Sequence, residues 1–183
     1  WDLARSRTLW AVAMTDAQIL RSRAVLGFVL VWLFVLLGAT LVRASVWTSD
    51  LTLWGDAAVG SPKKPRPFIN LGLAKERIGD KEGAWLAHQT ALALSYQPRL
   101  TVYQQKFSRV ASMTNMARML AQNGHELEAL SMLNQVIAEH PLFPHARLNR
   151  GVLLARLGRC EEAKPDWAIA IQLEPGFGNP SCE

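Results

Sequence analysis

The sequence contains few cysteines and few charged residues. Among its 183 residues there are two cysteines, Cys160 and Cys182, and only 19% of the residues are charged. Two cysteines are too few for a disulfide-framed miniprotein or for a zinc site without histidine ligands. Half of the residues are hydrophobic, which excludes a disordered chain. Because the chain begins at Trp1 without an initiator methionine, we expect a processed or truncated product or the tail of a longer protein.

Motifs for cofactors and catalytic metals are also absent. The sequence has no G-x-G-x-x-G fingerprint, Walker A loop, H-E-x-x-H or C-x-x-C-H. The segment Ser61-Pro-Lys-Lys64 has the S-x-x-K spacing but no supporting motif, which favours a solvated turn. His140 and His145 flank a proline turn, and no cysteine or carboxylate is patterned to join them. We therefore expect no catalytic residue, no cofactor and no metal ion.

One long apolar run lies near the N-terminus. From Ala24 to Val42 the sequence reads AVLGFVLVWLFVLLGATLV, nineteen residues without a charge. As a helix this run is about 28 Å long, close to the ~30 Å hydrocarbon core of a bilayer. It predicts a transmembrane helix over residues 24–42. The alternatives are a cleaved signal peptide, whose apolar region is usually shorter, and a buried core helix.

The flanking cations predict the orientation of this helix. Within twenty residues on each side, four arginines precede the run and Arg43 alone follows it. The positive-inside rule then places the N-terminus in the cytoplasm and the rest of the chain in the periplasm or a lumen. We expect a single-pass protein of the inner (cytoplasmic) membrane. The preceding arginines are Arg5, Arg7, Arg21 and Arg23, while Lys63, Lys64 and Arg66 lie beyond the counted window.

Two further patterns concern the membrane. Residues 1–23 place apolar side chains on one helical face, which predicts an amphipathic interfacial segment; the alternative is the end of a preceding membrane segment. Small residues along the apolar run favour close packing against a partner helix, although glycine is frequent in such helices in any case. The first pattern consists of Leu3, Trp10, Met14, Ala17 and Leu20, and the second of Gly27, Val31, Val35 and Gly38.

A repeat follows the apolar run. The segments RIGDKEGA, QNGHELEA and RLGRCEEA each contain a glycine, four variable residues and an alanine. Gly124 and Gly158 of the second and third copies are 34 residues apart, which is the tetratricopeptide (TPR) period. The chain resembles a TPR protein from here on, and the fold class it predicts is all-α, with one transmembrane helix followed by a solenoid of helical hairpins. The expected segments are a half-repeat capping helix at 46–62, repeats at 65–98, 99–143 and 144–177, and a tail at 178–183.

The repeats match the TPR pattern with two departures. Small residues (Gly72, Ala117, Gly151) and large ones (His88, Leu133, Trp167) stand at matching positions, while Arg150 stands where leucine is usual. The second repeat contains eleven extra residues, RLTVYQQKFSR, close to three helical turns. We predict a lengthened first helix from about Thr101 to Gln122; an insertion loop is the alternative. Its expected apolar side consists of Val102, Val110, Met113 and Leu120.

The junction between the apolar run and the repeats has a second resemblance. The stretch RASVWTSDLTLWGDAAVGSPKKPRPFINLG is similar to the corresponding junction in TPR-containing O-mannosyltransferase-like membrane proteins. The residues that carry it are Arg43, Trp47, Leu53, Trp54, Asp56, Ser61, Pro62, Arg66, Asn70, Leu71 and Gly72. The resemblance implies repeats that face the lumen or periplasm. No catalytic residue of that family has a counterpart in this chain.

The repeats predict a binding surface. In TPR folds the first helices of the hairpins line a concave face, and three asparagines recur there at one repeat position, where they could hydrogen-bond an extended peptide. The alternative is that they satisfy neighbouring helix ends. The candidate contacts are Asn70, Arg77, Asn115, Arg118, Asn149 and Arg156.

Cys160 and Cys182 would lie outside the cytoplasm, where they could oxidise to a disulfide. Cys160 begins the last helix and Cys182 follows its end, so the tail would have to double back by roughly 20 Å to join them. Free thiols or contacts with a partner are the alternative.

The net charge of +5 is unevenly distributed. Residues 1–23 carry four arginines against two aspartates, residues 43–66 carry four cations against two acids, and the rest carries twelve against eleven. Most of the excess therefore flanks the bilayer, which favours lipid headgroups over nucleic acid. We expect a membrane-anchored protein-binding module, an accessory or assembly subunit of an integral membrane complex. The alternative is the non-catalytic C-terminal TPR part of a multi-spanning, lipid-linked-sugar glycosyltransferase-like protein.

Overall fold

The computed structural model describes residues 2–178 and 180–182, with side chains at residue 21 and from residue 23 onward within those ranges. The described chain is helical, with eight α-helices and two short 3-10 helices and no strand in those ranges. It divides into two compact units, Trp1–Thr48 and Ser49–Glu183.

The first unit consists of α1 (Asp2–Ser45) and the 3-10 helix η1 (Val46–Thr48). Within it, Arg23–Thr48 is long and apolar enough to cross a membrane, and none of its most apolar window is buried. A buried core helix, one of the alternatives considered for residues 24–42, is therefore not what the structure shows. The backbone of residues 2–23 continues the same helix, while the side chains predicted to form an amphipathic face (Leu3, Trp10, Met14, Ala17, Leu20) lie outside the described side chains.

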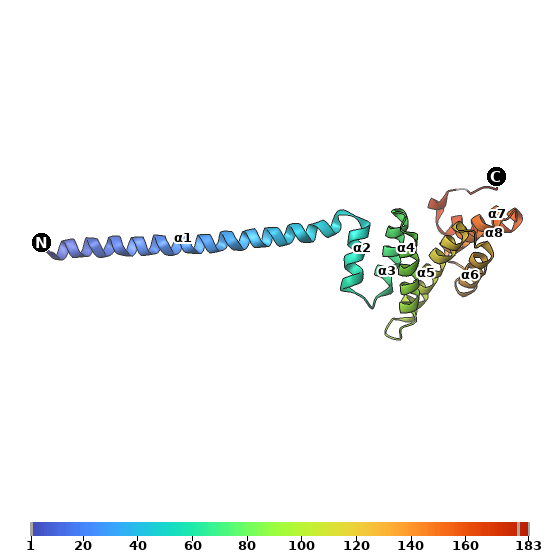
Figure 1. The fold of residues 1–183 in the computed structure, drawn as a ribbon, viewed down its shortest axis with the longest axis horizontal. Helices are drawn as coiled ribbons and strands as arrows, with labels where there is room; N and C mark the ends of the chain where they lie inside the picture. Colours follow the sequence, from blue (N-terminus) through green and yellow to red (C-terminus); the bar gives the residue numbers. More distant parts are fainter. Residues whose placement is uncertain (1, 179, 183) are drawn as a thin grey trace. The chain divides into compact units, whose positions relative to one another are not determined.

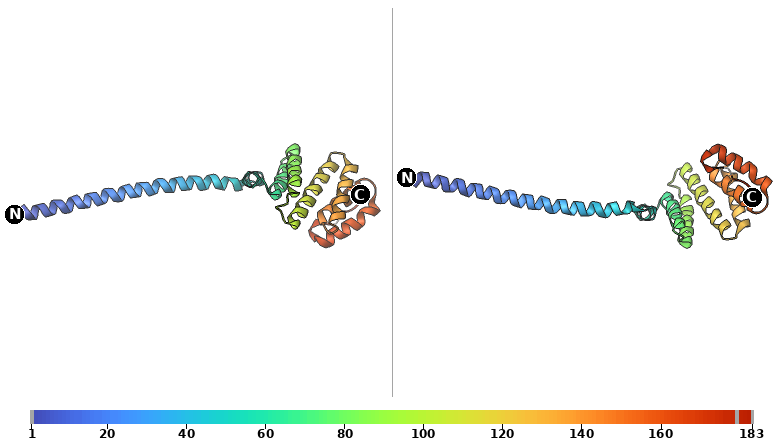
Figure 2. Two further views of the ribbon diagram at one scale, coloured as in Figure 1. Left: turned by 90° about the horizontal axis from the view of Figure 1, so that it is seen from below. Right: turned by 90° about the horizontal axis from the view of Figure 1, so that it is seen from above.

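The second unit is a series of antiparallel helical hairpins (Figures 1 and 2). Successive helices pack against each other, and α3 also contacts α5, as α5 contacts α7. The first helices of successive hairpins therefore form one layer. The elements are α2 (Asp50–Gly60), α3 (Pro65–Arg77), α4 (Lys81–Ser95), α5 (Val102–Gln122), α6 (Glu126–Glu139), α7 (Pro144–Arg156), α8 (Cys160–Leu173) and η2 (Pro175–Phe177).

Local sequence signals set the ends of these helices. Ser49 and Thr101 each form a capping box with the residue three positions later, which satisfies backbone N–H groups at the starts of α2 and α5. Pro65 and Pro144 stand at the starts of α3 and α7, where a missing N–H costs nothing. Gly79, Gly124 and Gly158, the glycines shared by the three repeats, have φ of +83°, +84° and +75°, a conformation that residues with a side chain rarely adopt. Each lies in the turn that joins the first helix of a hairpin to the second.

Each hairpin is held by a small residue that faces a large one. A Cβ atom added at Gly72 would lie 2.4 Å from the ring of His88, and one at Gly151 would lie 2.5 Å from Trp167 Nε1. The backbone of the first helix therefore touches the aromatic ring of the second helix. In the middle hairpin, Ala117 and Leu133 are the corresponding pair, both buried. The smaller the residue on the first helix, the larger the side chain that it accommodates.

The eleven extra residues are helical. The structure has one uninterrupted helix, α5, of 21 residues, whereas its hairpin partner α6 has 14. The first turns of α5 thus extend beyond the partner helix. Val110, Met113 and Leu120 are buried as the apolar side of α5, but Val102 is 67% exposed, so its assignment to that side was wrong. Val102 stands in the first turn, where no second helix covers it.

The other expected segments differ from the structure mainly at their ends. Of the residues expected to form the capping helix, 46–48 form η1, Ser49 is a cap, and α2 ends at Gly60. The helix α2 packs against α3, as the second helix of a preceding half-repeat would. The third repeat ends in η2, whose Phe177 lies edge-on to His145 at a centroid distance of 5.0 Å.

Candidate functional site

A concave groove runs along the first helices of the hairpins. It encloses about 840 Å³ and is formed by α3, the start and middle of α5, and the start of α7. Its lining consists of Lys64, Pro65, Arg66, Ile69, Asn70, Leu73, Leu100, Thr101, Tyr103, Gln104, Phe107, Ser108, Ala111, Thr114, Asn115, Phe143 and His145.

Two of the three candidate asparagines lie in the groove. Asn70 and Asn115 are part of its lining, whereas Asn149 is not. All three side chains are partly exposed, and none forms an intramolecular hydrogen bond within the described residues. The structure therefore gives no sign that these amides satisfy helix ends, and those of Asn70 and Asn115 are open to a ligand.

The three candidate arginines lie outside the groove. Arg77 and Arg118 line a second hollow of about 350 Å³ near the end of α3, which shares Leu73 with the groove. Each of the two forms an ion pair, Arg77 with Asp50 and Arg118 with Glu76. Arg156 donates to the carbonyl oxygen of Ala121 at 3.2 Å and pairs with Glu126 at 3.3 Å. These arginines link consecutive hairpins.

Glu76 occupies the centre of one such link. His88, fully buried, has its Nε2 2.9 Å from Glu76 Oε1, and Arg118 lies 2.6 Å from Glu76 Oε2. Since an ionised carboxylate can only accept, the histidine nitrogen donates. Burial alone would raise the pKa of Glu76, but the hydrogen bond from His88 and the charge of Arg118 hold that pKa below its ordinary value of 4.5. This arrangement ties both helices of the first hairpin to the second.

Arg150, the departure from the repeat pattern, has a structural partner. Asp166 on α8 is only 1% exposed and receives Arg150 Nε at 2.6 Å and Nη2 at 2.8 Å. Arg147 adds a third bond to the same carboxylate at 2.8 Å. The unusual arginine in the first helix is therefore matched by a buried acid in the second helix.

The aromatic side of the groove is a feature that the sequence analysis missed. Tyr103 and Phe107 stack with centroids 6.2 Å apart, and Phe107 lies edge-on to Phe143 at 6.5 Å. Tyr103 is 76% exposed and Phe107 45% exposed. Both belong to the lengthened part of α5, and their spacing of four residues is the signal that could have placed them on one helical face.

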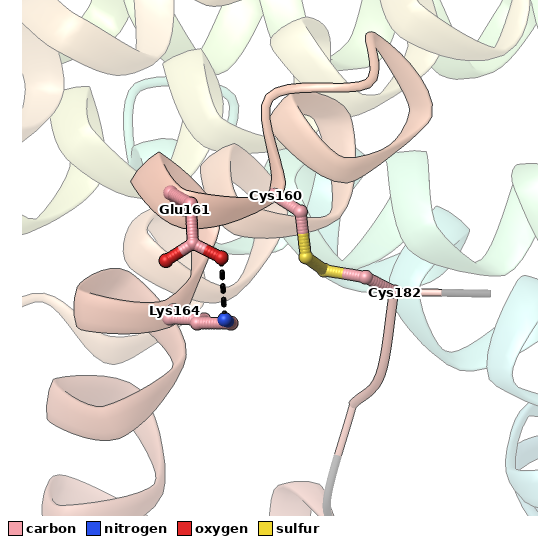
Figure 3. The surroundings of a disulfide bond; sticks show 4 residues. All are labelled: Cys160, Glu161, Lys164 and Cys182. Carbon is pink, nitrogen blue, oxygen red and sulfur yellow. Dashed lines mark hydrogen bonds and ion pairs between the residues drawn. A yellow bond between two sulfur atoms is a disulfide. The ribbon is translucent and has the colours of Figure 1, made fainter.

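A disulfide holds the C-terminal tail. Cys160 at the start of α8 is bonded to Cys182, with their Cα atoms 6.0 Å apart (Figure 3). The tail turns back through η2 and Gly178, whose φ is +74°. The first turn of α8 also carries an exposed ion pair between Glu161 and Lys164 at 2.6 Å. Neither cysteine lines the groove.

The small residues of α1 are open. A Cβ atom at Gly27 or Gly38 would meet nothing within 4 Å, and Val31 and Val35 are 63% and 53% exposed. Packing of this stripe against a partner stays a prediction. Among the described residues, no group of three or more histidine, cysteine, aspartate and glutamate side chains is arranged to hold a metal ion.

Comparisons with known proteins identify the fold. No protein-family model and no curated protein matches the chain. Among solved structures, sixteen chains match. One is a thermophilic TPR protein from Thermus thermophilus, 23% identical, with a TM-score of 0.53 over 76% of this chain and 72% of that one. The prediction of an all-α, TPR-like solenoid is confirmed. The resemblance of residues 43–72 to O-mannosyltransferase-like proteins stays a prediction.

Proposed function

We propose that this chain is a membrane-anchored binding module whose groove takes an extended segment of a partner protein. The groove is the observation that carries the proposal. It is continuous across α3, α5 and α7, and the side-chain amides of Asn70 and Asn115 in its lining have no intramolecular partner among the described residues. An amide offers both a donor and an acceptor, the two groups that an extended peptide backbone presents.

The partner in this proposal belongs to an integral membrane complex, in which the chain serves as an accessory or assembly subunit. The apolar stretch Arg23–Thr48 supports an anchor. The stripe of Gly27, Val31, Val35 and Gly38 would be a second contact, because small residues let another helix approach closely. In this proposal the N-terminus is cytoplasmic and the repeats are periplasmic or lumenal. Alkaline phosphatase fused after Glu183 should then be active, and an inactive, cytoplasmic fusion would reverse the orientation.

Affinity purification in mild detergent tests the binding function. The wild-type chain should retain a stoichiometric partner, and the double variant Asn70→Ala/Asn115→Ala should lose most of it. Gln135→Ala is the matched control, because Gln135 is an exposed amide on α6, a second helix, and does not line the groove. A chain that purifies alone under all conditions, or a control variant that loses the partner equally, would count against a role for the groove.

One observation favours a second function. The residues from Arg43 to Gly72 resemble the junction of O-mannosyltransferase-like proteins, so the chain would be the non-catalytic C-terminal part of a larger glycosyltransferase-like protein. Sequencing the gene upstream of Trp1 separates the two functions. Several hundred hydrophobic residues in the same reading frame would favour the glycosyltransferase, and a start codon just before Trp1 would exclude it.

A further inference from the structure

The charges at the turns that join successive hairpins, before α3 and before α5, are unbalanced. Most cations of the second unit pair with a carboxylate, as Arg109 does with Glu139 at 2.6 Å. Among the described residues, six do not. Four of these six lie in or directly after the turns before α3 and α5, Lys106 lies just over one turn into α5, and Lys81 begins α4. The five other than Lys81, which we call the cationic end, are Lys63, Lys64, Arg66, Arg99 and Lys106.

The two turns of the cationic end are joined. Arg99 donates from Nη2 to the carbonyl oxygen of Lys63 at 2.5 Å, which holds the turn before α5 against the turn before α3. No acid is close in sequence, because residues 57–75 and 83–125 contain neither aspartate nor glutamate. A surface that carries several positive charges and no negative ones attracts anionic ligands over several ångströms.

The cationic end opens into the groove. Lys64 and Arg66 belong to the groove lining, and that lining contains no carboxylate. The exposed rings of Tyr103 and Phe107 form one side of the groove. The amide of Asn70 and the amide nitrogen of Gln104, whose oxygen accepts from the Thr101 backbone N–H in the capping box, also contribute to the groove. Cations, exposed rings and amides thus meet on one concave surface.

We propose that the segment bound in the groove is acidic and carries an aromatic or large apolar side chain. Its carboxylates would lie against Lys64 and Arg66, its apolar side chain against Tyr103 and Phe107, and its backbone along the amides. This inference rests on the proposed function and specifies the chemistry of the partner. A basic segment is disfavoured because nothing in the lining would neutralise it. A flat membrane surface fits less well, since two of the cations line a concave surface.

Selection from a random decapeptide library tests the inference with the full chain in non-ionic detergent. The expected result is enrichment of peptides that combine several acidic residues with an aromatic or large apolar one. Enrichment of neutral or basic peptides would overturn the acidic inference but leave a peptide-binding groove. Failure to enrich any peptide would overturn both.

The affinity of the strongest selected peptide for variants of the chain then shows where the peptide binds. Lys64→Glu/Arg66→Glu should weaken binding at least about tenfold, and Phe107→Ala should weaken it by a similar factor. Lys81→Glu is the matched control, because Lys81 also has no carboxylate partner among the described residues but lies outside the groove. This variant should bind the peptide with an affinity within about twofold of the wild type. Equal loss in the control would assign the effect to overall charge. Competition by phosphatidylglycerol vesicles, with no loss in Phe107→Ala, would assign the cationic end to lipid headgroups and overturn the inference.

Discussion

Substitution of Gly151 by alanine is the sharpest test of how the hairpins pack. The new Cβ atom would lie 2.5 Å from Trp167 Nε1 and 2.6 Å from Cδ1, whereas ordinary contacts begin near 3.4 Å. An overlap of about 1 Å must be relieved by moving either the α7 backbone or an indole that is only 5% exposed. Such overpacking costs about 1–3 kcal/mol, and the higher helix propensity of alanine offsets up to about 1 kcal/mol of it. We expect Gly151→Ala to lower the free energy of unfolding by about 1–2 kcal/mol.

The assay is urea denaturation of the full chain in detergent, followed by circular dichroism. Gly55→Ala is the matched control, because Gly55 also lies inside a helix but a Cβ atom there meets nothing within 4 Å. It should stabilise the chain by about 0.5–1 kcal/mol. The two glycines should therefore respond with opposite signs.

A double variant tests whether contact with the Trp167 indole causes the loss of stability in Gly151→Ala. Trp167→Leu makes the pair at 151 and 167 resemble Ala117 and Leu133 of the middle hairpin. In that background Gly151→Ala should cost at least about 1 kcal/mol less than in the wild type, since residues in contact couple by about that amount. An equal cost in both backgrounds, or no cost in the wild type, would refute the packing argument.

Three other predictions concern ion pairs and the disulfide. Cys182→Ser breaks the bond to Cys160, which closes a loop with a sequence separation of 22, and should lower the free energy of unfolding by about 3 kcal/mol in urea denaturation. An unchanged free energy of unfolding would mean that the disulfide does not stabilise the fold. Glu76→Gln should have a lower free energy of unfolding than the wild type at pH 7, and this difference should shrink as the pH falls below about 5, because the stability that comes from a lowered carboxyl pKa is lost on protonation. A difference that widens in a urea denaturation series from pH 7 to 3 would contradict this. Asp166→Asn should lower the free energy of unfolding by about 3 kcal/mol, because it leaves two partly buried arginines without the buried carboxylate that they share. In the same urea assay the exposed Glu161→Gln should lower it by less than about 0.5 kcal/mol, and an equal loss in both variants would contradict this.

The repeat architecture could be predicted because its signals are local. The glycines at the hairpin turns, the small and large residues within each hairpin, and the length of the insertion all act over a few helical turns. The eleven inserted residues preserve the helical phase, so Val110 and Met113 keep the buried positions that the periodicity assigns to them. Val102 is exposed although the periodicity assigns it to the same face, because α5 is longer than α6 and a helix face is buried only where a partner helix covers it.

The candidate site could be predicted only in part. The position of Asn70 and Asn115 on the first helices follows from repeat register, and the structure places both in the groove. The ion pairs of the candidate arginines could not be predicted because their partners are remote in sequence: Arg77 pairs with Asp50, and Arg156 with Glu126. Such pairs depend on how one hairpin stacks on the next, which single-sequence periodicity does not specify. A role of these arginines in binding a partner stays a prediction. The exposed rings were missed because an aromatic residue in an amphipathic helix is more often buried.

Photo-crosslinking in native membranes tests the central claim that the groove is the binding surface. A photoreactive phenylalanine analogue would replace Phe107, in the groove, or Leu127, an 80% exposed residue on the second helix α6. The account predicts that the analogue at position 107 forms a covalent adduct with a partner protein and that the analogue at position 127 does not. Adducts at position 127 with none at position 107 would contradict the account and move the binding surface to the second helices.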